Sequence, residues 1–192
     1  MRGLIFDPFA GISGDMVLGA LVDLGLEPDW LRGVAASLGV DGIEVDVERV
    51  DRRGLSCARV SFRLPHQHAH RHLSDVLRIV EQSPLPAVAK AKASAAFRLL
   101  AQAEARVHGV TVEDVHFHEV GALDSILDVL CAMGGVERLG FEAFFTRPVE
   151  LGSGWIEAEH GRLPVPAPAT LGLLEGLPVR EAGLAGECTT PT

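Results

Sequence analysis

Hydrophobic and polar residues alternate along two stretches in the first third of the chain, residues 42–50 and 55–64. A period of two is typical of a half-buried strand, and residues 51–54 between the stretches end in a glycine. The pattern therefore predicts an antiparallel hairpin. A short apolar run, residues 4–6, predicts a buried strand near the N-terminus.

Longer stretches with helical spacing are bounded by serine, proline and glycine, which mark the starts and stops of helices. Helices are expected over residues 13–24, 28–39, 73–82, 86–107, 122–139 and 168–175. The fourth of these carries apolar positions at Val88, Ala95, Leu99, Ala103 and Val107. Short strands are expected around residues 147–152 and 154–160. This irregular alternation favours an α+β fold in a single domain over residues 1–192, with a mixed sheet, an antiparallel hairpin and several flanking helices.

Composition narrows the class of protein. The 47% of apolar residues can form a sizeable core, whereas the net charge of −9 weighs against nucleic-acid binding. No apolar run is long enough to cross a membrane, and the N-terminus lacks the pattern of a signal peptide. The three cysteines are far apart, which suits a reducing compartment. We therefore expect a soluble cytoplasmic protein with neither a nucleic-acid nor a membrane partner.

The segment "HQHAHRH" places His66, His68, His70 and His72 at every second position. In an extended chain the four imidazoles project from one side, and neutral imidazole suits nickel, zinc and copper. The segment is predicted to be a loop that collects metal ions. A solvated loop whose histidines bind nothing remains the alternative.

The segment "VHFHEVGALDSILD" brings further ligand types together. His116 and His118 share one face of an extended segment, whereas Glu119 points to the other. Asp124 and Asp128 are four apart on the expected helix, so they lie one above the other. The spacing fits two interpretations equally well. One is a metal site of two histidines and two aspartates; the other is a helix with an acidic first turn beside two partly buried histidines.

The segment "FDPFAGISGDM" predicts a strand, a glycine-bearing turn and the start of a helix. Asp7 ends the strand, Gly11 and Gly14 flank the turn, and Ser13 precedes a helix whose first turn holds Asp15. Such turns bind phosphate, and a neighbouring carboxylate can hold a divalent cation. A tight turn with a capping aspartate is the alternative.

Taken in order, several segments of the chain resemble the nickel insertion proteins of lactate racemase cofactor synthesis. These segments are "FDPFAGISGDMVLGALVDLG", the histidine tract, "EARVHGVTVEDVHFHEVGALDSILDV", "HGRLPVPAPAT" and "ECTTPT". The resemblance implies a nickel chelatase that inserts Ni²⁺ into pyridinium-3,5-bisthiocarboxylic acid mononucleotide and so forms a nickel–carbon bond. It further implies CTP with Mg²⁺ or Mn²⁺, a C-terminal half that binds the CTP, and the lactate racemase apoprotein as recipient of the cofactor.

The same resemblance suggests a role for each candidate residue. His116, His118, Asp124 and Asp128 would hold nickel supplied by the histidine tract, and Glu119 or Asp124 would accept the displaced proton. The turn made by Asp7, Gly11, Ser13, Gly14 and Asp15 would lie near the substrate phosphate. Two rival functions are a nickel storage or delivery chaperone and a metal-dependent phosphohydrolase. A homo-oligomer is compatible with each of these three functions.

Overall fold

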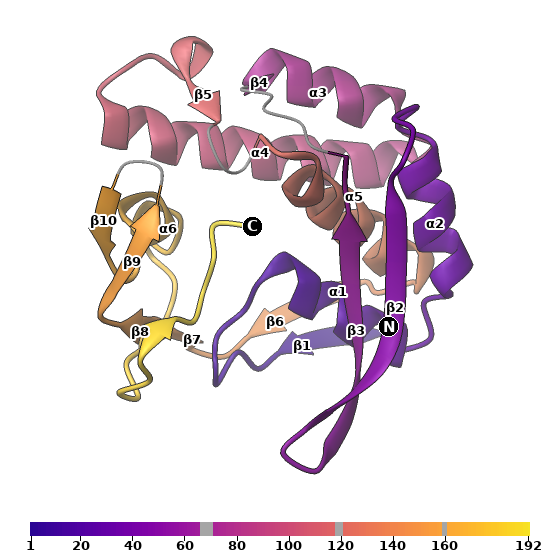
Figure 1. Cartoon of the computed structure of the whole chain (residues 1–192), viewed down its shortest axis with the longest axis horizontal. Coiled ribbons are helices and arrows are strands. Elements are labelled where there is room, and N and C mark those ends of the chain that lie inside the picture. The colour runs from indigo at the N-terminus through magenta and orange to yellow at the C-terminus, as the bar shows by residue number, and fades with distance from the viewer. Residues whose placement is uncertain (66–70, 118–120, 159–160) are drawn as a thin grey trace.

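The computed structural model describes residues 1–65, 71–117, 121–158 and 161–192 (Figure 1). Its helices are α1 (Gly14–Asp23), α2 (Pro28–Ala36), α3 (Leu73–Gln82), α4 (Ala87–His108), α5 (Leu123–Arg138) and α6 (Pro168–Leu173), with a short 3₁₀ turn at Val112–Asp114. Figure 1 shows α3 and α4 above α5 and α1, with α2 on one side and α6 on the other. The predicted helices are thus all present, with ends that differ by up to three residues.

The strands are β1 (Gly3–Phe6), β2 (Glu44–Arg52), β3 (Leu55–Arg63), β4 (Arg71–His72), β5 (His116–Phe117), β6 (Ala143–Thr146), β7 (Val149–Glu150), β8 (Gly152–Ser153), β9 (Trp155–Ala158), β10 (Gly161–Pro164), β11 (Val179–Arg180) and β12 (Gly186–Glu187). Among the described residues they form two-stranded sheets. The pairs β1–β6 and β7–β11 are parallel, and the other four pairs are antiparallel. The predicted α+β class, with both kinds of strand pairing, is confirmed.

The predicted hairpin is β2–β3, in which Arg52 pairs with Leu55. Its turn is shorter than the sequence indicated, because only Arg53 and Gly54 lie between the paired residues. Both have positive φ, 55° and 86°, as a type I′ turn requires. The Gly54 N–H also donates to the Asp51 carboxylate at 2.9 Å, which closes the turn.

Helix α4 buries a different face from the one that its larger apolar residues suggested. Val88, Leu99 and Val107 are about half exposed. The buried face is made of smaller residues together with one aromatic ring and one leucine: Ala89, Ala93, Ala101, Phe97 and Leu100. Alanine on this face lets α3 and α5 pack against α4. Of the exposed residues, Leu99 and Val107 line cavities.

The histidine tract was predicted to be a loop throughout, and this is wrong at its end. Arg71 and His72 form β4, which pairs with β5; residues 66–70 lie outside the described part of the chain. The pairing joins segments more than forty residues apart, so no local pattern signals it. The strand β6 was missed for the same reason, because its partner β1 comes from the other end of the chain.

Helix α1 lies between the hairpin and α5, where it forms the centre of the core. Leu18 and Leu21 of α1 are buried with Leu127 and Leu130 of α5. On the hairpin side, a Cβ added at Gly19 would lie 2.4 Å from the carbonyl oxygen of Ala58. The backbone of α1 therefore touches the backbone of β3, a contact that only glycine allows. In the part of the chain that the structure describes, no helix is long and apolar enough to span a membrane.

This contact predicts opposite effects for two glycine substitutions within helices. Gly19→Ala should lower the free energy of unfolding by about 1–3 kcal/mol, because α1 must move away from β3. Gly33→Ala on α2 is the matched control, since its new methyl group meets nothing within 4 Å. The control should raise the free energy by up to about 1 kcal/mol through helix propensity. Urea unfolding of both variants measures the difference, and changes of the same sign would contradict the packing described.

Candidate functional site

Three aspartates converge where the start of α1 meets α5. Asp15 lies in the first turn of α1, and Asp124 and Asp128 lie one turn apart on α5. A Cβ added at Gly14 would lie 2.4 Å from Oδ2 of Asp128. Glycine at position 14 therefore lets the Asp128 carboxylate lie directly over the start of α1.

Burial and like charge together change the proton affinity of this cluster. Burial of the Asp128 carboxyl raises its pKa from 3.8 to about 7, and the negative charges of Asp15 and Asp124 contribute to the rise. The neighbours are held in place by local bonds: the Ser13 hydroxyl donates to Asp15, and the Ser125 N–H donates to Asp124 at 2.8 Å. At neutral pH Asp128 can therefore accept or release a proton.

The aspartates line a cavity of about 350 Å³. The other polar residues that line it are Arg59, Ser13, Ser61, Ser125, Thr190 and Thr192. A second cavity of about 700 Å³ shares Asp124, Ser125, Thr190 and Thr192 with it. The sizes fall in the range of small-molecule sites, and the shared residues place the two cavities side by side.

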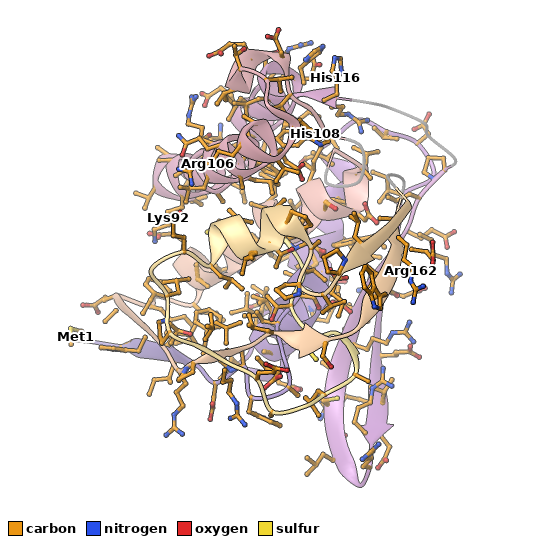
Figure 2. The ribbon with its side chains drawn as sticks, turned by 90° about the vertical axis from the view of Figure 1, so that its left-hand side faces the viewer. Met1, Lys92, Arg106, His108, His116 and Arg162 are labelled. Carbon is orange, nitrogen blue, oxygen red and sulfur yellow. The ribbon has the colours of Figure 1, made fainter. Side chains whose placement is uncertain are left out.

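The larger cavity contains a histidine that the sequence analysis did not single out. Nε2 of His108, at the end of α4, lies 3.4 Å from Oε2 of Glu104 one turn earlier. Both residues line the cavity with Asp124, and Figure 2 labels His108 in the upper part of the molecule, below His116. The spacing of four on a helix was a usable signal for this pair, within "EARVH".

The glycine turn before α1 packs against the last residues of the chain. Gly11 has a φ of 101°, and an added Cβ would lie 1.7 Å from the Cys188 carbonyl oxygen. The Ile12 N–H donates to that oxygen at 2.9 Å, and the Thr190 N–H donates to the Ile12 carbonyl at 3.1 Å. Close packing accounts for glycine at position 11, and phosphate binding at this turn stays a prediction.

A buried glutamate fixes the same terminal segment. Glu150 is 0% exposed, and its carboxylate accepts the Ala182 N–H at 3.0 Å and pairs with Arg180 at 3.3 Å. The Thr189 hydroxyl donates to the Glu150 carbonyl at 2.7 Å. These bonds hold the segment that continues into Thr190 and Thr192, which line both cavities. Nothing in the sequence around Glu150 indicated that its charge is buried.

Asp7 does not line either of these two cavities with the other acids. Its carboxylate lies 3.8 Å from the Arg147 guanidinium and is about half exposed. Asp7 was predicted to act with Asp15, whereas Asp15 lies with Asp124 and Asp128 in the structure.

The two histidine segments meet through β4 and β5. His72 is paired with His116, and their ring centroids are 4.0 Å apart; Figure 2 shows His116 at the outer surface. His66, His68, His70, His118 and Glu119 lie outside the described residues. Within the described ranges, no three His, Cys, Asp or Glu side chains form a group that could hold a metal ion. The four-ligand set of His116, His118, Asp124 and Asp128 therefore stays a prediction.

The fold and the site define an α+β protein whose acidic cluster faces cavities suited to a small ligand. A family model described as "Nickel insertion protein" matches residues 4–192, so the chain belongs to the nickel insertion protein family. It is 45% identical over 192 residues to the pyridinium-3,5-bisthiocarboxylic acid mononucleotide nickel insertion protein of Desulfitobacterium hafniense, covering 100% of this chain and 48% of that relative.

A protein of Geotalea daltonii that is also named for nickel insertion is 48% identical over 194 residues, covering 100% of this chain and 50% of the relative. The chain thus spans about half the length of the curated relatives that it matches. No solved structure matches it.

The raised pKa of Asp128 predicts how stability depends on pH in Asp128→Asn. The folded state holds the Asp128 proton up to pH about 7, whereas the unfolded chain loses it near pH 3.8. The free energy of unfolding of the wild type therefore falls as the pH rises from 3.8 to about 7. The Asn variant lacks this loss. Relative to wild type it should gain up to about 4 kcal/mol between pH 4 and 8.

Chemical unfolding in the presence of a chelator measures this difference. Asp29→Asn is the control for removing a carboxylate from the surface, because the Asp29 side chain is 93% exposed and pairs with Arg32 at 2.7 Å. A constant difference between wild type and Asp128→Asn across the same range would contradict the burial described.

Proposed function

We propose that this chain takes part in inserting Ni²⁺ into pyridinium-3,5-bisthiocarboxylic acid mononucleotide. The supporting observation is that the match to the nickel insertion family covers residues 4–192 and so includes the acidic cluster and both cavities. In this reaction nickel is a substrate, and the thiocarboxylates supply soft sulfur ligands. The protein then has to provide a hard cation site, a proton acceptor and a route for nickel.

The cation site is assigned to Asp15 and Asp124. Carboxylates from two helices facing one cavity are suited to Mg²⁺ or Mn²⁺, which commonly bridge carboxylates and phosphate. Arg59 and Ser61 line the same cavity. Arg59, which pairs with Glu48 at 3.4 Å, is the residue assigned to the phosphate. The use of CTP, and its binding by a C-terminal half, belong to the same proposal.

Asp128 is assigned as the proton acceptor. When nickel replaces hydrogen on the pyridinium ring, the C–H bond breaks, its electron pair forms the nickel–carbon bond, and a proton leaves. A base is most effective when its pKa lies near the working pH, and the pKa of Asp128 is about 7. The resemblance suggested Glu119 or Asp124 for this role. Glu119 lies outside the described residues, and the half-buried setting of Asp128 supports the assignment to Asp128.

The histidines are assigned to nickel delivery. The contact between His72 and His116 joins the end of the histidine tract to the segment that leads into α5. Ions collected by the tract can thus pass towards the helix that carries Asp124 and Asp128. Lactate racemase, as recipient of the finished cofactor, completes the proposed pathway.

The test of this function is reconstitution. The chain is joined to the remaining half of the D. hafniense relative, supplied with nickel, CTP and the mononucleotide, and assayed by activation of lactate racemase apoprotein. Asp128→Asn should lower the insertion rate by about 100-fold or more while nickel binding is retained. Asp29→Asn is the control with wild-type activity. A fully active Asp128→Asn variant would exclude the proton-accepting role.

A nickel chaperone is the second candidate, favoured by the contact between His72 and His116. Deleting residues 66–70 separates the two functions. For nickel insertion, the deletion should reduce nickel bound at equilibrium but leave insertion intact at saturating nickel. For a chaperone, nickel binding and cofactor yield should fall together. Turnover of a simple phosphate ester without nickel would instead favour the phosphohydrolase.

A further inference from the structure

The parallel pair β1–β6 has one bare apolar face. Ile5 and Phe145 are directly opposite each other in the register, and they are 65% and 55% exposed. Phe9, just beyond β1, is 65% exposed. Parallel strands are normally covered on both faces, and two strands alone are marginally stable. The bare face therefore lacks the cover that such strands ordinarily have.

The opposite face of the pair is also incompletely covered. Leu4 packs against the core, but Phe6 and Phe144 line an apolar cavity of about 580 Å³. Leu99 and Leu177, both about half exposed, line the same cavity. Figure 2 shows β1 reaching outward from the body of the molecule, with Met1 at its end. The strand pair thus lies at the periphery of the molecule, with an exposed apolar face on one side and a cavity on the other.

Charged groups surround this apolar centre. Arg147 pairs with Asp7 at 3.8 Å next to the bare face. On the opposite face, Lys92 pairs with Glu137 at 3.3 Å and lies over the Phe144 ring. An apolar and aromatic centre with a polar rim is typical of a protein interface. A small-molecule site would instead be concave around its ligand, whereas Ile5 and Phe145 project outward.

We propose that this face, defined by Ile5, Phe9 and Phe145, is where the second half of the family's longer chain docks. The matched relatives contain about as much chain again as the part that this chain matches. That half is tethered to the first in every molecule of such a relative, so its effective concentration at the face is high. A second copy of this chain has no such advantage and is the competing occupant.

The experiment uses this chain joined to the remaining half of the D. hafniense relative through a protease site. After cleavage, sedimentation velocity and titration of the separated halves measure whether they stay associated, without nickel or nucleotide. The variants are Ile5→Asp and Phe145→Asp, with Phe145→Ser as a milder change. Leu55→Asp is the control, since Leu55 is 73% exposed at the hairpin turn. Circular dichroism confirms that each variant is folded.

The wild-type halves and the Leu55→Asp halves should remain associated after cleavage. Each change at Ile5 or Phe145 should weaken association by about tenfold or more. Dissociation of the wild-type halves, or association that these changes do not weaken, overturns the proposal. The proposal is also overturned if this chain alone forms a dimer and Phe145→Asp dissociates that dimer. Because no metal or nucleotide is present, failure here leaves the nickel proposal untouched.

Discussion

The close approach of α1 to its two neighbours is the constraint on which the rest of the structure depends. Gly19 lets the helix touch the backbone of β3, and Gly14 lets Asp128 of α5 lie over its first turn. A side chain at either position would push α1 outward and open the core around Leu18 and Leu21. The packing of α1 that closes the core thus also holds the Asp128 carboxylate in a half-buried position between Asp15 and Asp124. Stability and the chemistry of the site arise from one packing arrangement.

Local sequence patterns predicted the helices and the hairpin because propensity, capping and turn chemistry act over a few residues. Ser13 before α1, Pro86 before α4 and the glycine of the hairpin turn all lie where the patterns placed them. The strand β6 and the pair β4–β5 were missed, since their hydrogen bonds join distant segments. The buried face of α4 was misjudged because alanine, the smallest apolar side chain, fills the tightest contacts.

The site was predictable in its residues more than in its arrangement. Asp124 and Asp128 share a helix, so their proximity followed from spacing alone. Asp15 joins them through the packing of α1 on α5, which no spacing reveals, whereas Asp7 lies 3.8 Å from Arg147 outside the cluster. His72 meets His116 through a two-residue sheet, and the Glu150 charge is buried by a segment thirty residues further on. In each case a contact between distant elements decides which groups act together.

The titration of the Asp128 carboxyl tests this account most directly. Carbon-13 NMR of aspartate-labelled protein, assigned with Asp128→Asn, follows the side-chain carboxyl signal against pH in the absence of metal. A half-buried Asp128 between two acids should titrate with a pKa of about 7. Added Mg²⁺ should lower this pKa if it binds at the proposed site of Asp15 and Asp124, because a nearby cation favours the ionised carboxylate. A pKa near the ordinary value of 3.8, unaffected by Asp124→Asn, would contradict the half-buried position of Asp128 between two acids and the proton-accepting role proposed for it.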